Sequence, residues 1–171
     1  MTQGKWFLNV TTREGRVLRQ LTEAVGAKRV VEIGTSSGYS TIWLALGVRA
    51  TEGKVFTHEI DPAKVEMARA NFETAGVDDL ITIIEGDAHE TIKQHKEPID
   101  VLFLDAEKKG YVDYLDKLLP LIRPGGLILG HDMHRPMPDP RYIEAITTNP
   151  DLDTSFLMME SFGISMTGKK R

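Results

Sequence analysis

The stretch from Val30 to Tyr39 reads VVEIGTSSGY and constrains the fold of this chain more than any other segment. A β-branched run followed by Gly34 predicts a buried strand that ends abruptly, because glycine tolerates the backbone angles of a tight turn. Gly38 and Ser40 then predict the start of a helix. A strand, a glycine turn and a helix N-terminus in this order present backbone N–H groups and indicate a binding place for a polar ligand.

Strand and helix patterns alternate along the rest of the chain. Apolar spacing predicts a helix over Arg13–Val25 before the first strand, Arg29–Ile33. Four further parallel strands are expected after it, at Lys54–Ile60, Ile81–Ile84, Ile99–Leu104 and Leu127–Leu129. Two more strands, Thr154–Met159 and Ile164–Thr167, lie close enough in sequence to pair as a hairpin. This order predicts one α/β domain over residues 1–171, with a doubly wound, mostly parallel sheet.

The composition excludes several classes of function. The chain has no cysteine, so disulfides and thiolate metal sites are excluded, and a metal would need oxygen or imidazole ligands. The net charge of −4 at pH 7 argues against a nucleic-acid partner, because phosphate contacts need clustered Lys and Arg. No window reaches the roughly 20 apolar residues of a membrane span, so we expect a soluble, cytoplasmic protein with no membrane partner.

Acidic residues stand in or beside the ends of four of the five parallel strands, as Glu32, Glu59, Asp105 and Asp132. The carboxyl ends of parallel strands share one edge of a sheet, so these carboxylates are expected to converge. The alternative is that they only cap the following helices, which explains one or two such acids more readily than four. Glu59 also stands where a carboxylate accepts hydrogen bonds from ribose hydroxyls in nucleotide-binding sheets.

Four motifs together carry a family resemblance. In chain order they are EIGTSSGYS at Glu32–Ser40, EID at Glu59–Asp61, FLDAEK at Phe103–Lys108 and RPGG at Arg123–Gly126. The sequence resembles the cation-dependent O-methyltransferases related to catechol and caffeoyl-CoA O-methyltransferases over about Val10 to Thr167. The resemblance implies a class I, Rossmann-like methyltransferase fold with seven strands and a reversed last strand. It also implies the cofactor S-adenosylmethionine (SAM) and a small hydroxylated acceptor, catechol-like or phenolic.

The resemblance assigns cofactor contacts to individual positions. The residues that it implies are Val10, Glu32, Gly34, Ser40, Glu59, Asp87, Ala88 and Asp105. Gly34 would lie under the methionine part of SAM, with Glu32 and Ser40 near its amino and carboxylate ends. Glu59 would hold the ribose hydroxyls, and Asp87 with Ala88 would border the adenine.

The resemblance also implies a catalytic half of the site. Asp105 and Asp132 would bind a divalent cation such as Mg²⁺, which can gather an acceptor hydroxyl and lower its pKa. Lys108 would be the general base, acting together with Asp105. The alternative for Lys108 is a solvated lysine, and the sequence favours neither interpretation.

Two features depart from the family pattern. Met133 stands where the family usually has a metal-binding Asn, and a thioether is a poor ligand for Mg²⁺. His131 or His134 would suit only a softer ion, and lone histidines are more often packing or surface residues. Family members usually carry further helices before the position of Val10. We therefore expect an acceptor site that is open, completed by a partner subunit in a homodimer, or built from the loop His134–Pro140.

Two other functions stay open from the sequence. A SAM-binding protein of the same fold without transfer activity is consistent with Met133 and with the short segment before Val10. A nicotinamide-dependent oxidoreductase would share the strand-end acid Glu59. However, GTSSG lacks the G-x-G-x-x-G fingerprint of dinucleotide sites, so this function ranks behind the others.

Overall fold

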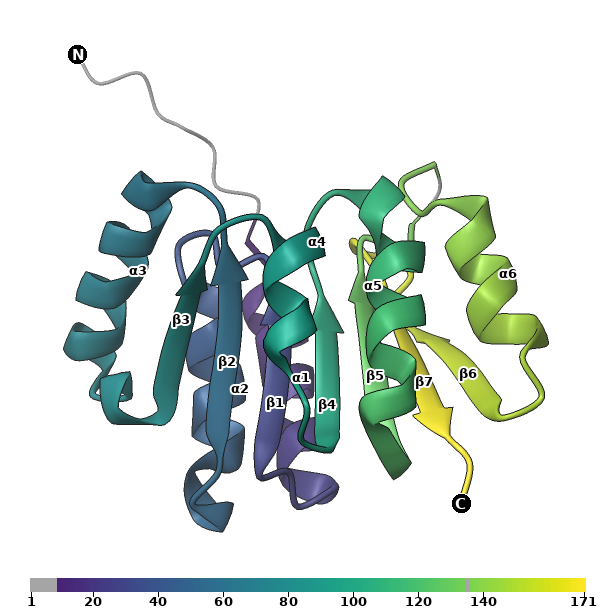
Figure 1. The fold of residues 1–171 in the computed structure, drawn as a ribbon, viewed down its shortest axis with the longest axis horizontal. Helices are drawn as coiled ribbons and strands as arrows, with labels where there is room; N and C mark the ends of the chain where they lie inside the picture. The colour runs from purple at the N-terminus through teal and green to yellow at the C-terminus, as the bar shows by residue number, and fades with distance from the viewer. Residues whose placement is uncertain (1–8, 135) are drawn as a thin grey trace.

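The structure, a computed structural model, describes residues 9–134 and 136–171, which form one sheet of seven strands between two layers of helices (Figure 1). The strands are β1 (Arg29–Ile33), β2 (Lys54–Glu59), β3 (Ile81–Glu85), β4 (Ile99–Leu104), β5 (Ile122–His131), β6 (Leu152–Leu157) and β7 (Ile164–Lys169). Their order across the sheet is β3-β2-β1-β4-β5-β7-β6. β7 runs antiparallel to both of its neighbours, and the other pairs are parallel. The predicted doubly wound sheet with a reversed last strand is confirmed.

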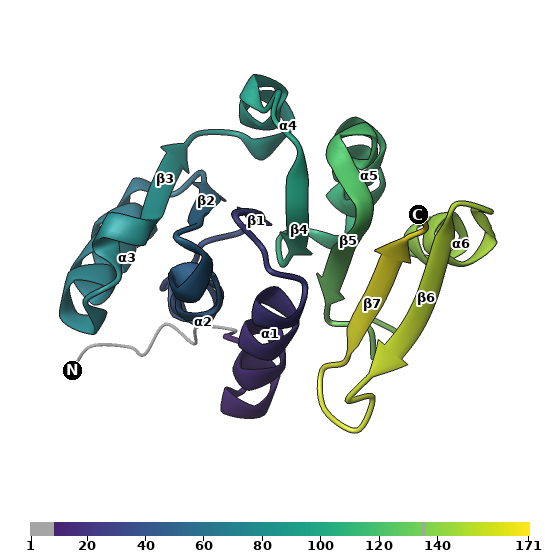
Figure 2. The same ribbon diagram turned by 90° about the horizontal axis from the view of Figure 1, so that it is seen from below.

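The helices cover the sheet on both faces. They are α1 (Thr12–Ala24), α2 (Tyr39–Val48), α3 (Pro62–Ala75), α4 (Ala88–Thr91), α5 (Tyr111–Leu118) and α6 (Pro140–Thr148). Figure 2 shows α1, α2 and α3 on one face and α4, α5 and α6 on the other. Successive strand residues face opposite layers. Val30 and Val101 belong to the core cluster under α1 to α3, whereas Val31 and Leu102 belong to the cluster under α5 and α6.

Local sequence explains where several helices begin and end. Thr11 caps α1 in a capping box: its Oγ1 accepts from Glu14 N at 3.2 Å, and Glu14 Oε2 accepts from Thr11 N at 2.7 Å. Asp61 caps α3, and Pro62 occupies the first helical position, where its missing N–H costs nothing. Gly76 ends α3 in a left-handed conformation with a φ of 62°.

The start of β5 corrects the prediction. The other six strands begin and end within about two residues of their expected limits, but β5 begins at Ile122 instead of Leu127. Ile99 pairs with Ile122, and Val101 pairs with Leu127. The Pro-Gly-Gly segment between those pairs is therefore a bulge within one strand, not a turn that precedes it.

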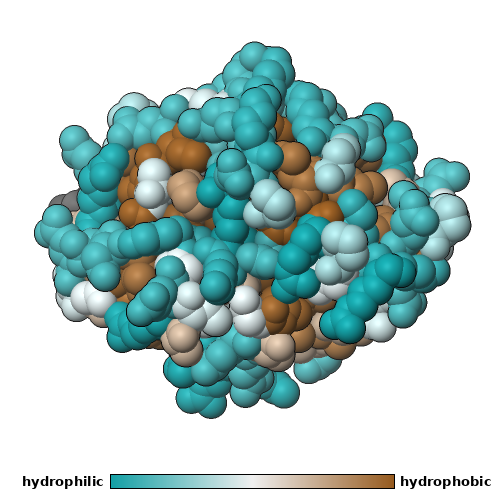
Figure 3. All heavy atoms as spheres, turned by 60° about the horizontal axis from the view of Figure 1, so that its bottom comes forward, coloured by the Kyte–Doolittle hydropathy of each residue, from teal (hydrophilic) through white to brown (hydrophobic). Residues whose placement is uncertain are grey.

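Apolar side chains are exposed at particular places. On the face shown in Figure 3, hydrophilic residues dominate and apolar residues form separate patches. The large apolar side chains that are exposed in the described residues are Ile60, Met137, Phe156 and Phe162. Ile60 follows β2, Met137 follows β5, and Phe162 precedes the antiparallel β7, so all three lie at the carboxyl edge of the parallel strands. Across residues 9–134 and 136–171, no helix combines the length and the apolarity that a membrane crossing requires.

Candidate active site

The turn after β1 passes close to the end of β4. Gly34 has a φ of 102°, and a Cβ atom at this position would lie 2.3 Å from the main-chain oxygen of Asp105. Asp105 N donates to Ile33 O at 2.9 Å, which holds the two strand ends together. Gly38 has a φ of 82° and is the first residue before α2. Glycine is required at the turn for two reasons, the backbone angle and the close approach of a neighbouring chain segment.

Gly34→Ala is expected to lower the free energy of unfolding by more than about 2 kcal/mol, because a methyl group there overlaps the main chain of Asp105. Gly26→Ala is the matched control. Gly26 has a φ of 62°, but a Cβ there would meet nothing within 4 Å. Its cost is therefore backbone strain alone, about 1 kcal/mol. Urea denaturation of both variants checks this, and equal losses would contradict the overlap as the cause.

Glu32 stands one residue before the end of β1. Its fully buried carboxylate accepts hydrogen bonds from Ser40 Oγ and Thr57 Oγ1, both at 2.6 Å, and from the hydroxyl of Thr41. Burial raises the pKa of Glu32 to about 7, although the three hydroxyl groups act in the opposite direction. The Glu32 carboxylate is therefore enclosed by hydroxyl groups, and the charge of Asp105 adds to its raised pKa. It joins α2 to β1 and β2, because it is paired with Thr57 in the strand ladder.

Glu59, the last residue of β2, accepts hydrogen bonds from the glycine turn after β1 and from the segment after β2. Its Oε2 accepts from Ser36 N at 2.8 Å, and its Oε1 accepts from Ile60 N and Asp61 N, both at 3.0 Å. A carboxylate offers about four acceptor positions, so three bonds leave capacity for another donor. Only 7% of Glu59 is exposed. The carboxylate is thus fixed in place before any ligand binds.

A cavity of 220 Å³ lies beside Glu59 at the carboxyl edge of the sheet. Four of the residues implied to contact the cofactor line it, namely Gly34, Glu59, Asp87 and Ala88. Its lining does not include the other four, which are Val10, Glu32, Ser40 and Asp105. The structure therefore brings together half of the implied cofactor set around one cavity.

The sequence did not predict three further residues that line the cavity, namely Ile60, His89 and Tyr114. Ile60 is 68% exposed at its rim. Tyr114 donates its hydroxyl to Glu107 Oε1 at 2.6 Å and stacks on the ring of His89, with 4.6 Å between the centroids. Tyr114 follows the same helical spacing as the residues of α5 that pack in the core. Apolar periodicity alone therefore cannot identify it as a cavity residue.

The segment before α1 lies against the glycine turn. Ser37 Oγ donates to Asn9 Oδ1 at 2.8 Å, and Thr12 Oγ1 is 3.1 Å from Tyr39 Oη. Val10 is buried in the same region, in the core cluster that includes residues of α1 and α2. Val10 is thus a buried core residue next to Asn9, and its contact with a cofactor stays a prediction.

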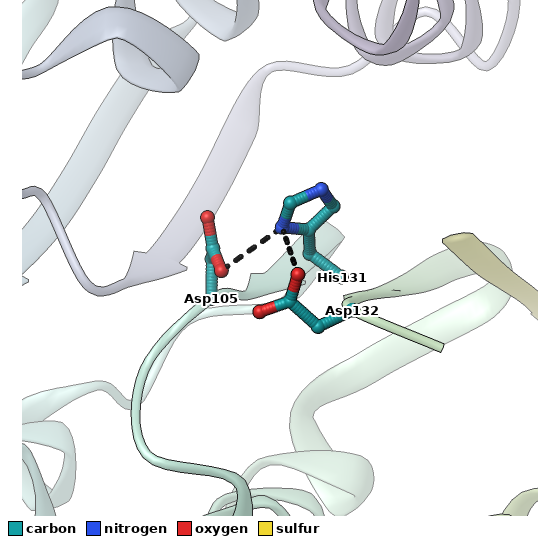
Figure 4. Close-up of side chains that lie close together, drawn as sticks. All are labelled: Asp105, His131 and Asp132. Carbon is teal, nitrogen blue, oxygen red and sulfur yellow. Dashed lines mark hydrogen bonds and ion pairs between the residues drawn. The ribbon is translucent and has the colours of Figure 1, made fainter. Parts of the chain in front are cut away.

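Asp105, His131 and Asp132 lie together at the ends of β4 and β5, with their side chains pointing toward one another (Figure 4). His131 Nδ1 is 3.1 Å from Asp105 Oδ1 and 3.5 Å from Asp132 Oδ1. Neighbouring strand residues normally face opposite sides. Asp132, however, has a φ of 59°, and this left-handed backbone brings its carboxylate to the same place as the imidazole. The expected convergence is therefore found for Asp105 and Asp132.

Lys108 completes this cluster. Its Nζ is 2.9 Å from Asp132 Oδ2 and 3.5 Å from Asp105 Oδ1. The same atom donates to Tyr111 Oη at 2.8 Å and to Ala106 O at 3.1 Å. The Lys108 side chain is only 17% exposed, so it is not the solvated lysine of the alternative interpretation.

Met133 lies outside the carboxylate cluster, and His131 lies within it. The Met133 side chain packs in the core cluster under α5 and α6 and is 2% exposed. His131 is the buried member of the carboxylate cluster, and its Nε2 is 3.4 Å from Glu14 Oε2. Burial opposes the charged imidazole, but Asp105, Asp132 and Glu14 together raise the pKa of His131 above its ordinary value.

Behind the cavity, His58 and His95 form a neutral pair with 2.9 Å between their Nε2 atoms. Arg29 Nη2 is 3.1 Å from His95 Nδ1, and a guanidinium can only donate. His95 therefore carries its proton on Nε2 and donates to His58, which in turn donates from Nδ1 to Thr91 Oγ1 at 2.8 Å. Burial lowers the pKa of His58 to about 3, with His95 adding to the effect. Burial and the charge of Arg29 lower that of His95 to about 4.

The pair predicts a loss of stability in acid. Both histidines stay neutral when folded but bind protons when unfolded below about pH 6.5, so their contribution is present above that pH and is lost as the pH falls. The stability advantage of the parent over a His58→Gln, His95→Gln double variant is expected to shrink by roughly 2 kcal/mol between about pH 6 and pH 5. Urea denaturation at both pH values measures it. An advantage that does not change with pH would contradict the assignment, and the exposed His134→Gln is the control.

The sheet order, the reversed β7 and the glycine turn over a strand-end cavity define the class I methyltransferase fold. A family model described as O-methyltransferase matches residues 3–133, and the chain belongs to this family.

Known relatives agree with this membership. A catechol O-methyltransferase of Mycobacterium tuberculosis is 40% identical over 121 residues, which cover 70% of this chain and 54% of the relative. A catechol O-methyltransferase of Niastella koreensis is 33% identical over 84% of this chain and 65% of its own length. The crystal structure of a Bacillus cereus O-methyltransferase in complex with S-adenosylhomocysteine (SAH) superposes with a TM-score of 0.84. It is 32% identical, and the match covers 95% of this chain and 83% of that one. The chain thus spans between half and two thirds of the length of these curated relatives.

Proposed function

We propose that the protein is a SAM-dependent O-methyltransferase that acts on a small hydroxylated acceptor, catechol-like or phenolic. The observation that carries this proposal is the shared position of two groups of residues at one edge of the sheet. The cavity beside Gly34 and Glu59 lies next to the end of β4, and the polar cluster of Asp105, Lys108 and Asp132 begins at that strand end. A cofactor and an acceptor can therefore meet there.

The cavity suits the nucleoside part of SAM. The remaining acceptor capacity of Glu59 would take a ribose hydroxyl. Asp87 and Ala88 would border the adenine, and Ile60 offers an exposed apolar side chain to its face. Gly34 lines the same cavity and would border the chain that links the ribose to the sulfonium.

The acceptor side combines polar and aromatic groups. Methyl transfer from a sulfonium is an in-line displacement, so the protein mainly has to orient a nucleophilic oxygen. Lys108 Nζ and the carboxylates of Asp105 and Asp132 would hold that oxygen and receive its proton. Phe162 is 42% exposed, with its ring centroid 5.7 Å from that of His131, and it would pack against an aromatic acceptor.

A divalent cation is part of the proposal. The donor set fits one, because atoms of Asp105, His131 and Asp132 lie within 4.8 Å of one another and two of the three are hard carboxylate oxygens. When bound, such an ion would supply Lewis-acid activation of the acceptor hydroxyl. Asp105 and Asp132 would hold it, and Lys108 would keep its place beside both carboxylates.

Calorimetric titration of the protein with SAM and with SAH tests the cofactor half. Binding of both is expected, and no binding of either at millimolar concentration would refute the proposal. Mass spectrometry of a panel of catechols and hydroxycinnamoyl compounds after incubation with SAM tests the transfer. SAH binding without methylation of any phenolic compound would favour a SAM-binding protein without transfer activity. Unchanged methylation after chelation would remove the cation from the proposal.

A further inference from the structure

We infer that His131 is the third protein ligand of the cation site and that the site therefore selects a transition metal such as Co²⁺ or Zn²⁺ over Mg²⁺. The inference rests on the proposed function only in taking Asp105 and Asp132 as cation ligands. It assigns to His131 a part that the sequence pattern gave to a residue at position 133.

The geometry places one nitrogen of His131 among the carboxylates. Nδ1 faces both of them, at 3.1 Å from Asp105 Oδ1 and 3.5 Å from Asp132 Oδ1 (Figure 4). Ligands on neighbouring positions of an ion at about 2.1 Å lie roughly 3 Å apart, and ligands on opposite positions roughly 4 Å apart. All three donor atoms lie within 4.8 Å of one another, which agrees with these separations.

The other nitrogen faces a carboxylate from a different layer. Nε2 of His131 is 3.4 Å from Glu14 Oε2, and it has no hydrogen-bond partner among the described residues. Glu14 Oε1 is buried and likewise unpaired in the described part of the chain. Metal-bound histidines almost always direct their second nitrogen at a carboxylate, carbonyl or water, which fixes the proton on that side. Glu14 provides this orientation, and the capping box with Thr11 holds Glu14 in place.

The net negative charge of the cluster also favours the binding of a cation. Glu14, Asp105 and Asp132 are three carboxylates with side-chain exposures of 0%, 14% and 13%, and Lys108 is the lysine that contacts the two aspartates. With a neutral imidazole, these four side chains sum to two negative charges. Buried charges are paired or coordinate metals, and a divalent ion balances this pair of charges.

The ligand chemistry sets the metal preference. Mg²⁺ prefers oxygen ligands and near-ideal octahedral geometry, whereas imidazole suits transition metals. A site with one imidazole and two carboxylates therefore gains affinity for Co²⁺ or Zn²⁺ relative to a site with three oxygen ligands. Met133 packs in the core, so it is not one of the three ligands.

Absorption spectroscopy and calorimetry with Co²⁺ and Mg²⁺, added to chelator-treated protein, test the inference without an acceptor. The parent is expected to bind Co²⁺ more tightly than Mg²⁺ and to show a d–d spectrum with a nitrogen ligand. His131→Asn is expected to lower the ratio of Co²⁺ to Mg²⁺ affinity at least tenfold and to change that spectrum. His134→Asn is the matched control, because it removes an exposed neighbouring imidazole outside the cluster.

Glu14→Gln is the second variant, because glutamine keeps the capping hydrogen bond but loses the charge behind His131. It is expected to weaken Co²⁺ binding about 10- to 100-fold. No Co²⁺ binding by the parent, or the same metal ratio and spectrum in His131→Asn, would overturn the inference. Titration of the same samples with SAH separates the outcomes, because SAH binding without metal binding refutes only the metal site.

Discussion

Replacing Glu59 with alanine is expected to weaken SAH binding at least a hundredfold, a loss of about 2.7 kcal/mol. Two effects add to each other. The variant loses the carboxylate that is proposed to accept from the ribose hydroxyls, and hydrogen bonds to a charged group contribute about 1.5 to 3 kcal/mol each. It also frees the N–H groups of Ser36, Ile60 and Asp61, which hold the two turns around the cavity. Calorimetric titration with SAH gives the affinity directly.

Glu85→Ala is the matched control for this variant. Glu85 ends β3 and is the ladder partner of Glu59, but it is exposed and pairs with Arg69 at 3.0 Å. Its removal takes away the same charge from the neighbouring strand end, and the SAH affinity is expected to stay within about twofold, because exposed ion pairs contribute little. Equal losses in both variants would mean that net charge, and not the position of Glu59, governs binding.

Much of the fold followed from local pattern. Strands that are apolar on both faces, as Val30 with Val31 and Val101 with Leu102 are, can only belong to a sheet covered on both sides. The start of β5 could not be predicted from local sequence, because residues far apart in the chain determine it. The bulge at Pro124 lies beside Arg123, whose guanidinium pairs with Asp100, and Asp100 in turn accepts from Lys28 N and Arg29 N. No window of sequence contains these partners together.

The candidate site was predictable where its residues end strands. Glu59, Asp105 and Asp132 follow from the rule that parallel strands end along one edge. Glu32 stands one residue before the end of β1, and the rule does not predict the hydroxyls of α2 and β2 that enclose its carboxylate. His131 was undervalued because strand alternation directs it away from Asp132, and nothing in the sequence announces the left-handed backbone at that aspartate. The sequence did not indicate Glu14, because this residue belongs to α1, which is far from His131 in the sequence.

Asp132→Asn is expected to reduce the rate of methyl transfer about a hundredfold or more while SAH binding stays within about threefold. Asparagine tolerates the left-handed backbone as aspartate does, so the φ of 59° brings no new strain. The change removes the charge that holds Lys108 Nζ at 2.9 Å and that faces His131 Nδ1 at 3.5 Å. Misplacement of catalytic groups by about 1 Å can cost a hundredfold in rate. Initial rates with the phenolic acceptor found in the panel, at saturating SAM, measure the effect.

Glu52→Gln provides the control for the lost charge. Glu52 is the other acidic residue with a positive φ in the described chain, at 54°, and it is exposed at the end opposite the proposed site, before β2. Its methyl transfer rate is expected to equal that of the parent. If Asp132→Asn instead keeps the parental rate, the acceptor is oriented without the Asp132 carboxylate. If it loses SAH affinity and rate by the same factor, Asp132 supports the cofactor half of the site. Only a selective loss of rate assigns Asp132 to the acceptor side, because the cavity beside Glu59 does not include it.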